Sequence, residues 1–285
     1  TLSRDTRSFF YPSFHLSYVL REHIKKAGGN LPSWISYAKF RASYAEVGND
    51  MGPYQLYNVY GIGNDPNGNV TSNTGTINFN PNVRSELLRN IEFGGEARFF
   101  NNKLSLDFSW YRSNAFNQLL DLELDPASGF GFRKINGGDV QNQGWELMAS
   151  ANIMDRESSF RWDASLNISR NVNSINDIAS DFQVDRYRIG GFDDLAFIAR
   201  TGGMYGEIWG HRYNRVTDES SQYYGQLILN NQGLPTRSGT PEYLGEQQAN
   251  EMASLINNIS YKNFGLTFQV DARFGGMMYV GTHRG

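Results

Sequence analysis

The chain has 285 residues, no cysteine and a formal net charge of −3. These values exclude disulfides, thiolate metal sites and a cysteine nucleophile, and they argue against a general nucleic-acid binder, which is usually strongly basic. Aromatic residues make up 14% of the chain, too many for a disordered protein, and no apolar run approaches the ~20 residues of a transmembrane helix.

Alternation of apolar and polar residues with a period of two predicts β-strands along most of the chain. The ranges with this pattern are, in chain order, 9–20 and 37–48 (both weaker), 90–99, 104–112, 145–153, 160–169 and 264–274. Another strand should precede the turn at 260–263, although 246–256 is the nearest approach to a helical period. Alternation over about ten residues also matches a tilted strand that crosses a bilayer.

The connections between these strands alternate between short and long. The short ones are 100–103, 154–159 and 260–263, the long ones are roughly 49–86, 118–137 and 173–250, and 21–36 is intermediate. Short turns at one end and long loops at the other are typical of an outer-membrane barrel. A soluble β-sandwich usually has more evenly spaced turns.

Strand direction then predicts where the longest connection lies. If the short turns are periplasmic, residues 173–250 begin and end outside the cell as one long extracellular excursion. The strand-like piece 201–215 would lie within this excursion or dip into the lumen. Eight strands remain to form the barrel wall.

One face of these strands is apolar, and the other carries many charges. We expect the apolar face to contact lipid, through Phe93, Phe108, Leu147, Trp162, Leu166, Phe268 and Val270. The alternative is the aromatic core of a soluble sheet, because β-propensity alone favours aromatic residues in strands.

Neither a catalytic nor a metal-binding motif is evident, so we expect no enzyme, no metal and no cofactor. The four histidines lack metal-ligand spacing, and no G-x-S-x-G nucleophile elbow is present. Residues 65–69 (DPNGN) are similar to the first half of a calcium loop, but Thr76 stands where the loop needs glutamate. A plain Asn-Gly turn is favoured there.

Ordered motifs give a more specific indication. They are 11–14 (YPSF), 39–49 (KFRASYAEVGN), 81–112, 136–147 (NGGDVQNQGWEL), 232–234 (QGL, followed by proline), 243–245 (YLG) and 260–276 (SYKNFGLTFQVDARFGG). Together they resemble the barrel of SusC/RagA-like TonB-dependent outer-membrane transporters. Ala45 departs from the family pattern, which has glycine there.

The resemblance implies an all-β fold, part of a large antiparallel transmembrane barrel of about 22 strands. Residues 1–285 would be an internal and C-terminal fragment of that barrel, without the family's plug domain. The implied partners are a SusD-like surface lipoprotein, TonB acting through the missing N-terminal region, and outer-membrane lipid. The implied cargo is an oligosaccharide or oligopeptide, and the implied location is the outer membrane of a Gram-negative bacterium.

Aromatic residues in the expected extracellular segments are candidates for substrate binding, because flat rings stack on sugars and contact peptides. They are Tyr54, Tyr57, Tyr60, Trp209, Tyr213, Tyr223 and Tyr224. Packing within the loops, or docking to a partner, would use the same residue types.

Two functions from different classes follow. The first is TonB-dependent active import of a glycan or peptide oligomer, and the alternative is a soluble all-β domain that binds or cleaves glycans. A passive porin is a weaker third. The barrel interpretation also predicts two open sheet edges, at about 9–20 and 264–274, so that the isolated segment should be ordered only beside the rest of the barrel.

Overall fold

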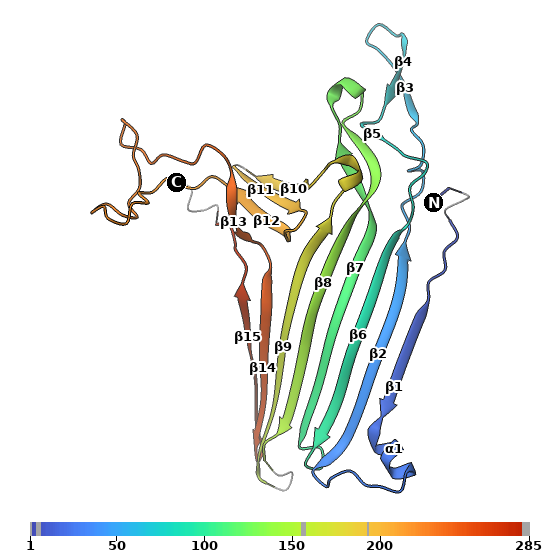
Figure 1. Ribbon diagram of the computed structural model, residues 1–285, viewed down its shortest axis with the longest axis vertical. Coiled ribbons are helices and arrows are strands. Elements are labelled where there is room, and N and C mark those ends of the chain that lie inside the picture. Colours follow the sequence, from blue (N-terminus) through green and yellow to red (C-terminus); the bar gives the residue numbers. More distant parts are fainter. Residues whose placement is uncertain (1, 4–6, 155–157, 193, 281–285) are drawn as a thin grey trace.

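A computed structural model describes residues 2–3, 7–154, 158–192 and 194–280 (Figure 1). Its main feature is a tall curved sheet in which chain neighbours are also spatial neighbours, joined antiparallel in the order β1-β2-β6-β7-β8-β9-β14-β15. These strands are β1 (Ser13–Val19), β2 (Ile35–Asn49), β6 (Glu86–Phe99), β7 (Leu104–Glu123), β8 (Phe132–Asn152), β9 (Phe160–Asp177), β14 (Ala249–Tyr261) and β15 (Phe264–Gly275).

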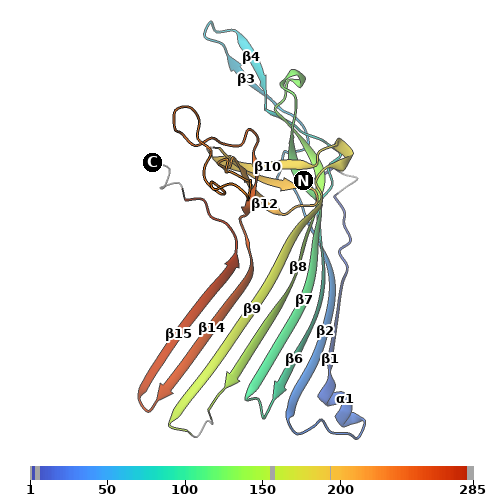
Figure 2. The same ribbon diagram turned by 60° about the vertical axis from the view of Figure 1, so that its left-hand side comes forward.

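The sheet is open, and its two edges are β1 and β15. These are the edges expected from the sequence. At one end the strands join through tight turns, such as the turn after β6, where Phe100, Asn101 and Asn102 all have positive φ. Asparagine tolerates this left-handed backbone better than most residues. Figure 2 shows these turns together at one end of the sheet, opposite the long excursions.

Two central strands extend beyond the expected ranges. β7 and β8 stay paired up to Glu123 and Phe132, so the long connection expected over 118–137 shrinks to 124–131, with the short 3-10 helix η1 (Pro126–Ser128). The prediction was wrong because both faces of this extension are polar or mixed. A period-two pattern is visible only where one face is apolar.

Two further segments, 246–256 and 21–36, can also be compared with the expectations from the sequence. The strand expected before the turn at 260–263 is β14, which includes residues 249–256 of the segment 246–256 and pairs with β9 on one side and β15 on the other. The intermediate segment 21–36 includes all of the short helix α1 (Leu20–Lys26) except its first residue. Among the described residues, the helices are too short and too polar to cross a membrane.

Three smaller β-elements lie at the end with the long excursions (Figure 1). β10 (Arg186–Phe192), β11 (Leu195–Arg200), β12 (Tyr205–Gly210) and β13 (Glu242–Glu246) form a four-stranded sheet within the excursion between β9 and β14, which also holds the 3-10 helix η2 (Ser180–Phe182). β3 (Tyr60–Asn64) and β4 (Val70–Thr74) form a projecting hairpin. β5 (Ile77–Asn78) pairs in parallel with the start of β8.

Register separates the sheet into two faces. Cross-strand partners such as Phe108 and Leu147, or Leu166 and Leu255, lie on an apolar face that also carries the seven residues expected to contact lipid. None of the seven is buried; Phe93 is 53% and Val270 56% exposed. The other, polar face carries the charged partners Glu96 and Asp107. The sequence pattern therefore placed these residues on the correct faces.

The buried core lies at the excursion end of the molecule. One cluster joins Ile135 and Ile175, at the upper parts of β8 and β9, to Ala199 of β11. A second joins Met51 and Val83 near the N-terminal residue Leu2. In the described residues, the only strongly buried side chain in the lower wall is polar, Asn257, at 3% exposure. It accepts a 3.0 Å hydrogen bond from Trp162 Nε1.

Candidate functional site: a charged hollow on the polar face

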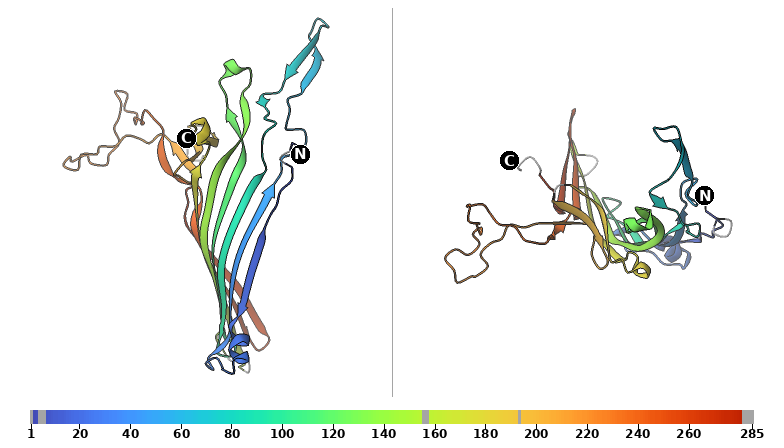
Figure 3. Two further views of the ribbon diagram at one scale, coloured as in Figure 1. Left: turned by 45° about the vertical axis from the view of Figure 1, so that its right-hand side comes forward. Right: turned by 90° about the horizontal axis from the view of Figure 1, so that it is seen from above.

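The polar face is hollowed by a cavity of about 710 Å³ that extends from β2 to β15. Because side chains from six strands line one continuous space, the polar face is the concave side of the sheet. Figure 3 shows the curvature of the sheet from above. The charged residues in the lining are Arg41, Asp107, Glu146, Asp271 and Arg273. Both signs of charge thus face the hollow.

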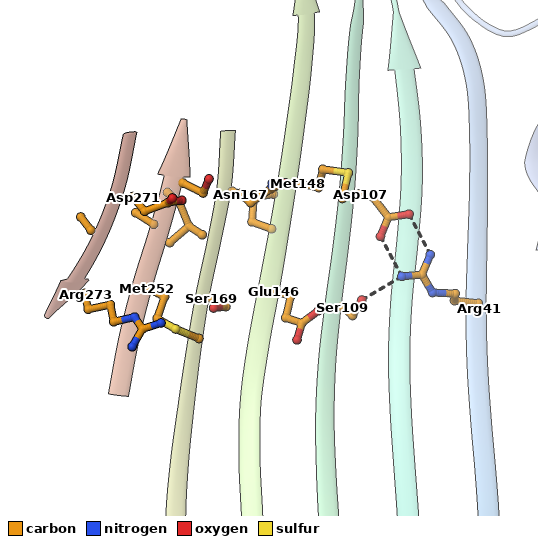
Figure 4. A pocket seen from close by; sticks show the side chains of 15 residues that line it. Arg41, Asp107, Ser109, Glu146, Met148, Asn167, Ser169, Met252, Asp271 and Arg273 are labelled. Atoms are coloured by element: carbon orange, nitrogen blue, oxygen red, sulfur yellow. Dashed lines mark hydrogen bonds and ion pairs between the residues drawn. The ribbon is translucent and has the colours of Figure 1, made fainter. Parts of the chain in front are cut away.

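A hydrogen-bond network centred on Arg41 forms one side of the hollow (Figure 4). The Arg41 guanidinium donates to both carboxylate oxygens of Asp107, at 2.9 and 2.7 Å, which is the bidentate geometry that suits this pair. It also donates to Ser109 Oγ at 2.8 Å and to Glu92 Oε1 at 3.4 Å. The cation is therefore held in place and largely neutralised.

Arg41 reaches Asp107 across an intervening strand. Arg41 is on β2, Asp107 is on β7, and Gly94 of β6 lies between them as the register partner of Arg41. A Cβ on Gly94 would lie 2.6 Å from Arg41 Nε and 3.0 Å from Phe108 O. Glycine leaves room for the guanidinium to lie directly on the backbone there.

The same device appears one strand further along. Tyr111 of β7 lies across Gly144 of β8, where an added Cβ would be 2.7 Å from the tyrosine hydroxyl. The hydroxyl donates to Asn171 Oδ1 of β9 at 3.1 Å. Asn171 and the buried Asn173 both donate to Asn142 Oδ1, and Asn173 Oδ1 accepts from Tyr205 N at 2.9 Å. This polar ladder joins the wall to β12.

The middle and the far side of the hollow have open hydrogen-bonding capacity. The Glu146 carboxylate makes no hydrogen bond or ion pair with any residue in the described ranges. Asn167 Oδ1 is buried and has no hydrogen-bond partner among them either. Asp271 accepts bonds from Gln269 Nε2 at 2.8 and 3.0 Å. A carboxylate and an amide oxygen are thus available to donors on a molecule inside the hollow.

The candidate aromatic residues lie elsewhere, and the structure does not bring them together. Tyr54, Tyr57 and Tyr60 are exposed at the base of the β3–β4 hairpin, with Tyr54 at 91%. The exposed Tyr213, Tyr223 and Tyr224 are in the excursion between β12 and β13. Figure 3 shows the hairpin and this excursion on different sides of the molecule. They form two separate aromatic surfaces.

Trp209 is less exposed than the six tyrosines, and its ring packs against two side chains. The Arg186 guanidinium carbon lies 4.8 Å from the ring centroid, and Tyr243 meets the ring edge-on at 6.2 Å. Trp209 Nε1 donates to Glu207 Oε2 at 2.8 Å. A sugar or peptide would have to compete with Arg186 for the face of this ring.

Glu207 is the buried charge of the four-stranded sheet, with 3% exposure. Besides Trp209, it accepts hydrogen bonds from the Arg200 guanidinium at 3.3 and 3.4 Å and from Met204 N at 3.3 Å. A buried carboxylate is tolerated when it is paired and hydrogen-bonded in this way. Its surroundings indicate a structural role in holding the β11–β12 turn.

The calcium-like segment 65–69 is a turn that satisfies its own carboxylate. Asp65 Oδ1 accepts from Asn67 N and Asn69 N, both at 2.8 Å, and Asp65 Oδ2 accepts from Asn69 Nδ2 at 2.9 Å. The hydrogen bond from the Asn69 side chain is the main cause of a lowered Asp65 pKa. The expected Asn-Gly turn is confirmed. No metal-binding group of three His, Asp or Glu residues occurs in the described part of the chain.

Sequence reasoning did not find the Arg41 network as a site. The charges were visible as the polar half of each alternating strand. Strand register, which alternation does not reveal, decides that Arg41 lies opposite Gly94 and Ser109. A glycine on the polar face of an otherwise regular strand was the available signal, because such a glycine often marks a close approach of another group.

Comparison with known proteins agrees with this architecture. The family model described as "TonB dependent receptor-like, beta-barrel" matches residues 1–271. The TonB-dependent receptor P3 of Formosa agariphila is 24% identical over 96% of this chain and 29% of its own length. The TonB-dependent receptor SusC of Bacteroides thetaiotaomicron is 23% identical over 97% of this chain and 28% of its own.

Solved structures share the fold. The RagAB peptide importer in its closed-closed state superposes with a TM-score of 0.77 at 18% identity, over 96% of this chain and 30% of that one. The RagAB peptide transporter gives a TM-score of 0.74 at 19% identity. This chain spans about 30% of the length of these relatives. The match over residues 1–271 confirms the resemblance seen in the motifs: the chain belongs to the TonB-dependent receptor-like β-barrel family.

Proposed function

We propose that the protein containing this chain imports a glycan or peptide oligomer across the outer membrane of a Gram-negative bacterium, driven by TonB. The observation that carries the proposal is the two-faced wall. One face is apolar and unburied, while the other is concave and charged. An outer-membrane barrel has this arrangement, with lipid outside and a wet lumen inside. Import of this kind makes and breaks no covalent bond, so we propose no enzymatic activity.

The lining of the hollow suits either a polar cargo that forms hydrogen bonds or a plug domain that would fill the lumen. Glu146 and Asn167 offer acceptors, while Arg273 offers donors at the far side. Peptide amides and sugar hydroxyls both satisfy such a mixed set. The RagAB neighbours are named as peptide importers, which favours an oligopeptide as the first cargo to test.

The excursion end supports the docking of a SusD-like lipoprotein. The exposed tyrosines of the hairpin base and of the β12–β13 excursion are the aromatic type enriched at protein interfaces. We propose that these tyrosines contact the lipoprotein or the cargo it carries. We also propose that residues 173–250 lie outside the cell. TonB would act through a region that is not part of this chain.

Uptake by cells tests the import proposal directly. The full-length protein should restore uptake of labelled oligopeptides or oligosaccharides to a deletion strain, and collapse of the proton gradient should abolish that uptake. Glu146→Gln should reduce uptake of the transported oligomer, while Glu123→Gln, at an exposed site where β7 ends, should not. Uptake that persists without the gradient would indicate a passive pore and contradict the proposal.

The alternative, a soluble glycan-binding domain, predicts that the isolated chain stays soluble without detergent. A soluble glycan-binding domain would not leave Phe264 80% and Leu266 58% exposed on an edge strand. Expression of residues 1–285 without detergent should therefore give aggregated material. A monodisperse, well-protected monomer in water would support the soluble domain instead.

A further inference from the structure

A second hollow lies on the opposite side of the wall from the charged cavity. It has a volume of about 370 Å³ and is lined by side chains of β7, β8 and β9. The side chains that matter are Trp110, Gln141, Gln143, Trp145, Arg170 and Ser174. No part of the proposed import path uses it, because it opens away from the lumen.

Register places this hollow at the upper border of the apolar face. Trp110, Trp145 and Arg170 form one cross-strand row, and the next row toward the short turns is Phe108, Leu147 and Ile168. The row further up is mixed, with Arg112 and Gln143 beside Val172, and the row above it holds Asn114, Gln141 and Ser174. Two indole rings therefore mark the line where the apolar face ends and a polar, basic surface begins.

The hollow does not depend on the rest of a barrel wall. Its three strands are central in the sheet, with β6 beside β7 and β14 beside β9. Its shape therefore does not arise from the open edges at β1 and β15. The charged hollow on the polar face differs, since one of its walls is the edge strand β15.

The chemistry of the lining selects an anion that also carries a sugar or another polar group. Arg112 lies beside the hollow as the register partner of the lining residue Gln143, and its exposed side chain makes no hydrogen bond or ion pair within the described ranges. Arg170 is half exposed, and its ion pair with Glu251 is long, at 3.6 Å. The amides of Gln141 and Gln143 add hydrogen-bond donors and acceptors. Guanidinium groups favour phosphate, to which they donate two hydrogen bonds at once.

We propose that this border hollow binds the phosphorylated sugar headgroup of an outer-leaflet glycolipid, whose acyl chains lie along Phe108, Leu147 and Ile168. Trp rings belong at the membrane–water interface. The long excursions place this border on the extracellular side. The inference rests on the proposed outer-membrane location, and it concerns the lipid-facing surface rather than transport.

Lipid retention by the full-length protein tests the inference. The protein is placed in phosphatidylcholine nanodiscs doped with diphosphoryl lipid A, and bound lipid is counted by native mass spectrometry. The double variant Arg112→Gln/Arg170→Gln should retain diphosphoryl lipid A roughly tenfold less than the wild type, because a hydrogen bond to a charged group contributes about 1.5 kcal/mol or more. Arg170→Lys, which keeps the charge, should lose much less.

The matched control is Arg161→Gln, which removes an exposed arginine from the opposite face of β9. It should leave retention unchanged. Dephosphorylated lipid A should show no preference for the wild type over the double variant, and inorganic phosphate should not displace the bound lipid, because the acyl chains contribute to binding. Equal retention by the wild type and the double variant, an equal loss with Arg161→Gln, or displacement by inorganic phosphate would each overturn the inference.

Failure of this inference is distinguishable from failure of the proposed function. If the double variant still enters nanodiscs and imports cargo while lipid retention is unchanged, only the lipid site is wrong. If the wild type itself does not enter nanodiscs as a folded protein, the outer-membrane location is wrong, and the lipid site is overturned with it.

Discussion

The wall and the excursion end of this chain are both β-structure, but different interactions stabilise them. Around β10–β13 an apolar core forms, with Ile135, Ile175 and Ala199 almost fully buried. The lower wall has no comparable core in the described residues, and its apolar side chains stay partly exposed. The excursion end has the buried core of a domain that folds in water, whereas the apolar side chains of the lower wall need lipid to cover them.

Backbone pairing shows the same contrast. In the wall, uninterrupted ladders such as β6–β7, from Leu87↔Phe116 to Phe99↔Leu104, satisfy the peptide groups that lipid would leave unpaired. In the excursion the ladders are short and contain bulges, for example between Ile198 and Ala199. Irregular pairing is tolerated there because water and buried side chains supply the missing hydrogen bonds.

The largest difference between the two regions should appear on removal of an apolar side chain. Ile135→Ala leaves a cavity in the excursion core and should lower the free energy of unfolding by roughly 2–5 kcal/mol. Leu147→Ala, on the apolar face, should cost clearly less, since lipid chains fill the space. Urea unfolding of the full-length protein in lipid vesicles measures both, and equal losses would contradict the assignment of separate solvents to the two regions.

A charge placed on the apolar face should sharpen the contrast between the two faces of the wall. Leu166→Arg, in the middle of β9, should cost about 2–4 kcal/mol because the guanidinium would lie near the bilayer midplane. The matched control is Met148→Arg on the polar face at nearly the same height, which should be close to neutral. The folded fraction in vesicles, read from heat-modifiable electrophoretic mobility, separates them. A harmless Leu166→Arg would contradict lipid contact.

Disturbing the close packing of Arg41 on Gly94 should lower the free energy of unfolding by a smaller amount. Gly94→Ala introduces a Cβ 2.6 Å from Arg41 Nε and 3.0 Å from Phe108 O, so the guanidinium must move away from Asp107. The expected loss is about 1–3 kcal/mol, the usual cost of overpacking. Urea unfolding in vesicles checks it.

Gly95→Ala is the natural control for that experiment. A Cβ added to Gly95 would lie on the apolar face, and the atom nearest to it would be Lys39 O at 3.4 Å. We expect a change within about 0.5 kcal/mol, as for most surface substitutions. If the two alanine variants behave alike, the arginine does not need the glycine.

The sequence predicted the wall well, because a transmembrane β-strand must alternate. The pattern placed Phe108 and Trp162 on the apolar face, and the strand count and both open edges were predicted correctly. Where both faces are wet, alternation disappears, and the upper ends of β7 and β8 were interpreted as loop for that reason.

The sites were much harder to predict than the wall. The Arg41–Asp107 pair depends on the register of β2, β6 and β7, and the border hollow depends on the register of β7, β8 and β9. Register is set by turns and bulges spread along the chain, so it is not readable from any single strand. The exposed tyrosines were identified by residue type alone, and type does not reveal that Trp209 is held by Arg186.

The smallest expected effect concerns the β3–β4 hairpin, which has neither a core nor lipid. Hydrogen bonds from the Asn69 side chain, Asn69 N and Asn67 N hold the pKa of Asp65 below its ordinary value of 3.8. A lowered folded-state pKa means that the ionised carboxylate stabilises the turn fully above pH 3.8. This contribution is lost only as the pH falls below 3.8 and through the folded-state value.

Hydrogen–deuterium exchange of residues 65–69, corrected for the intrinsic effect of pH, tests this expectation. The wild type should exchange more slowly than Asp65→Ala at neutral pH, and the two should converge once the carboxylate is protonated. Asp218→Ala is the matched control: its own turn accepts hydrogen bonds from Ser220, but it lies in another excursion. It should leave 65–69 unchanged at every pH. A wild-type hairpin whose protection does not depend on pH would show that turn backbone, and not the Asp65 carboxylate, holds this exposed part of the chain together.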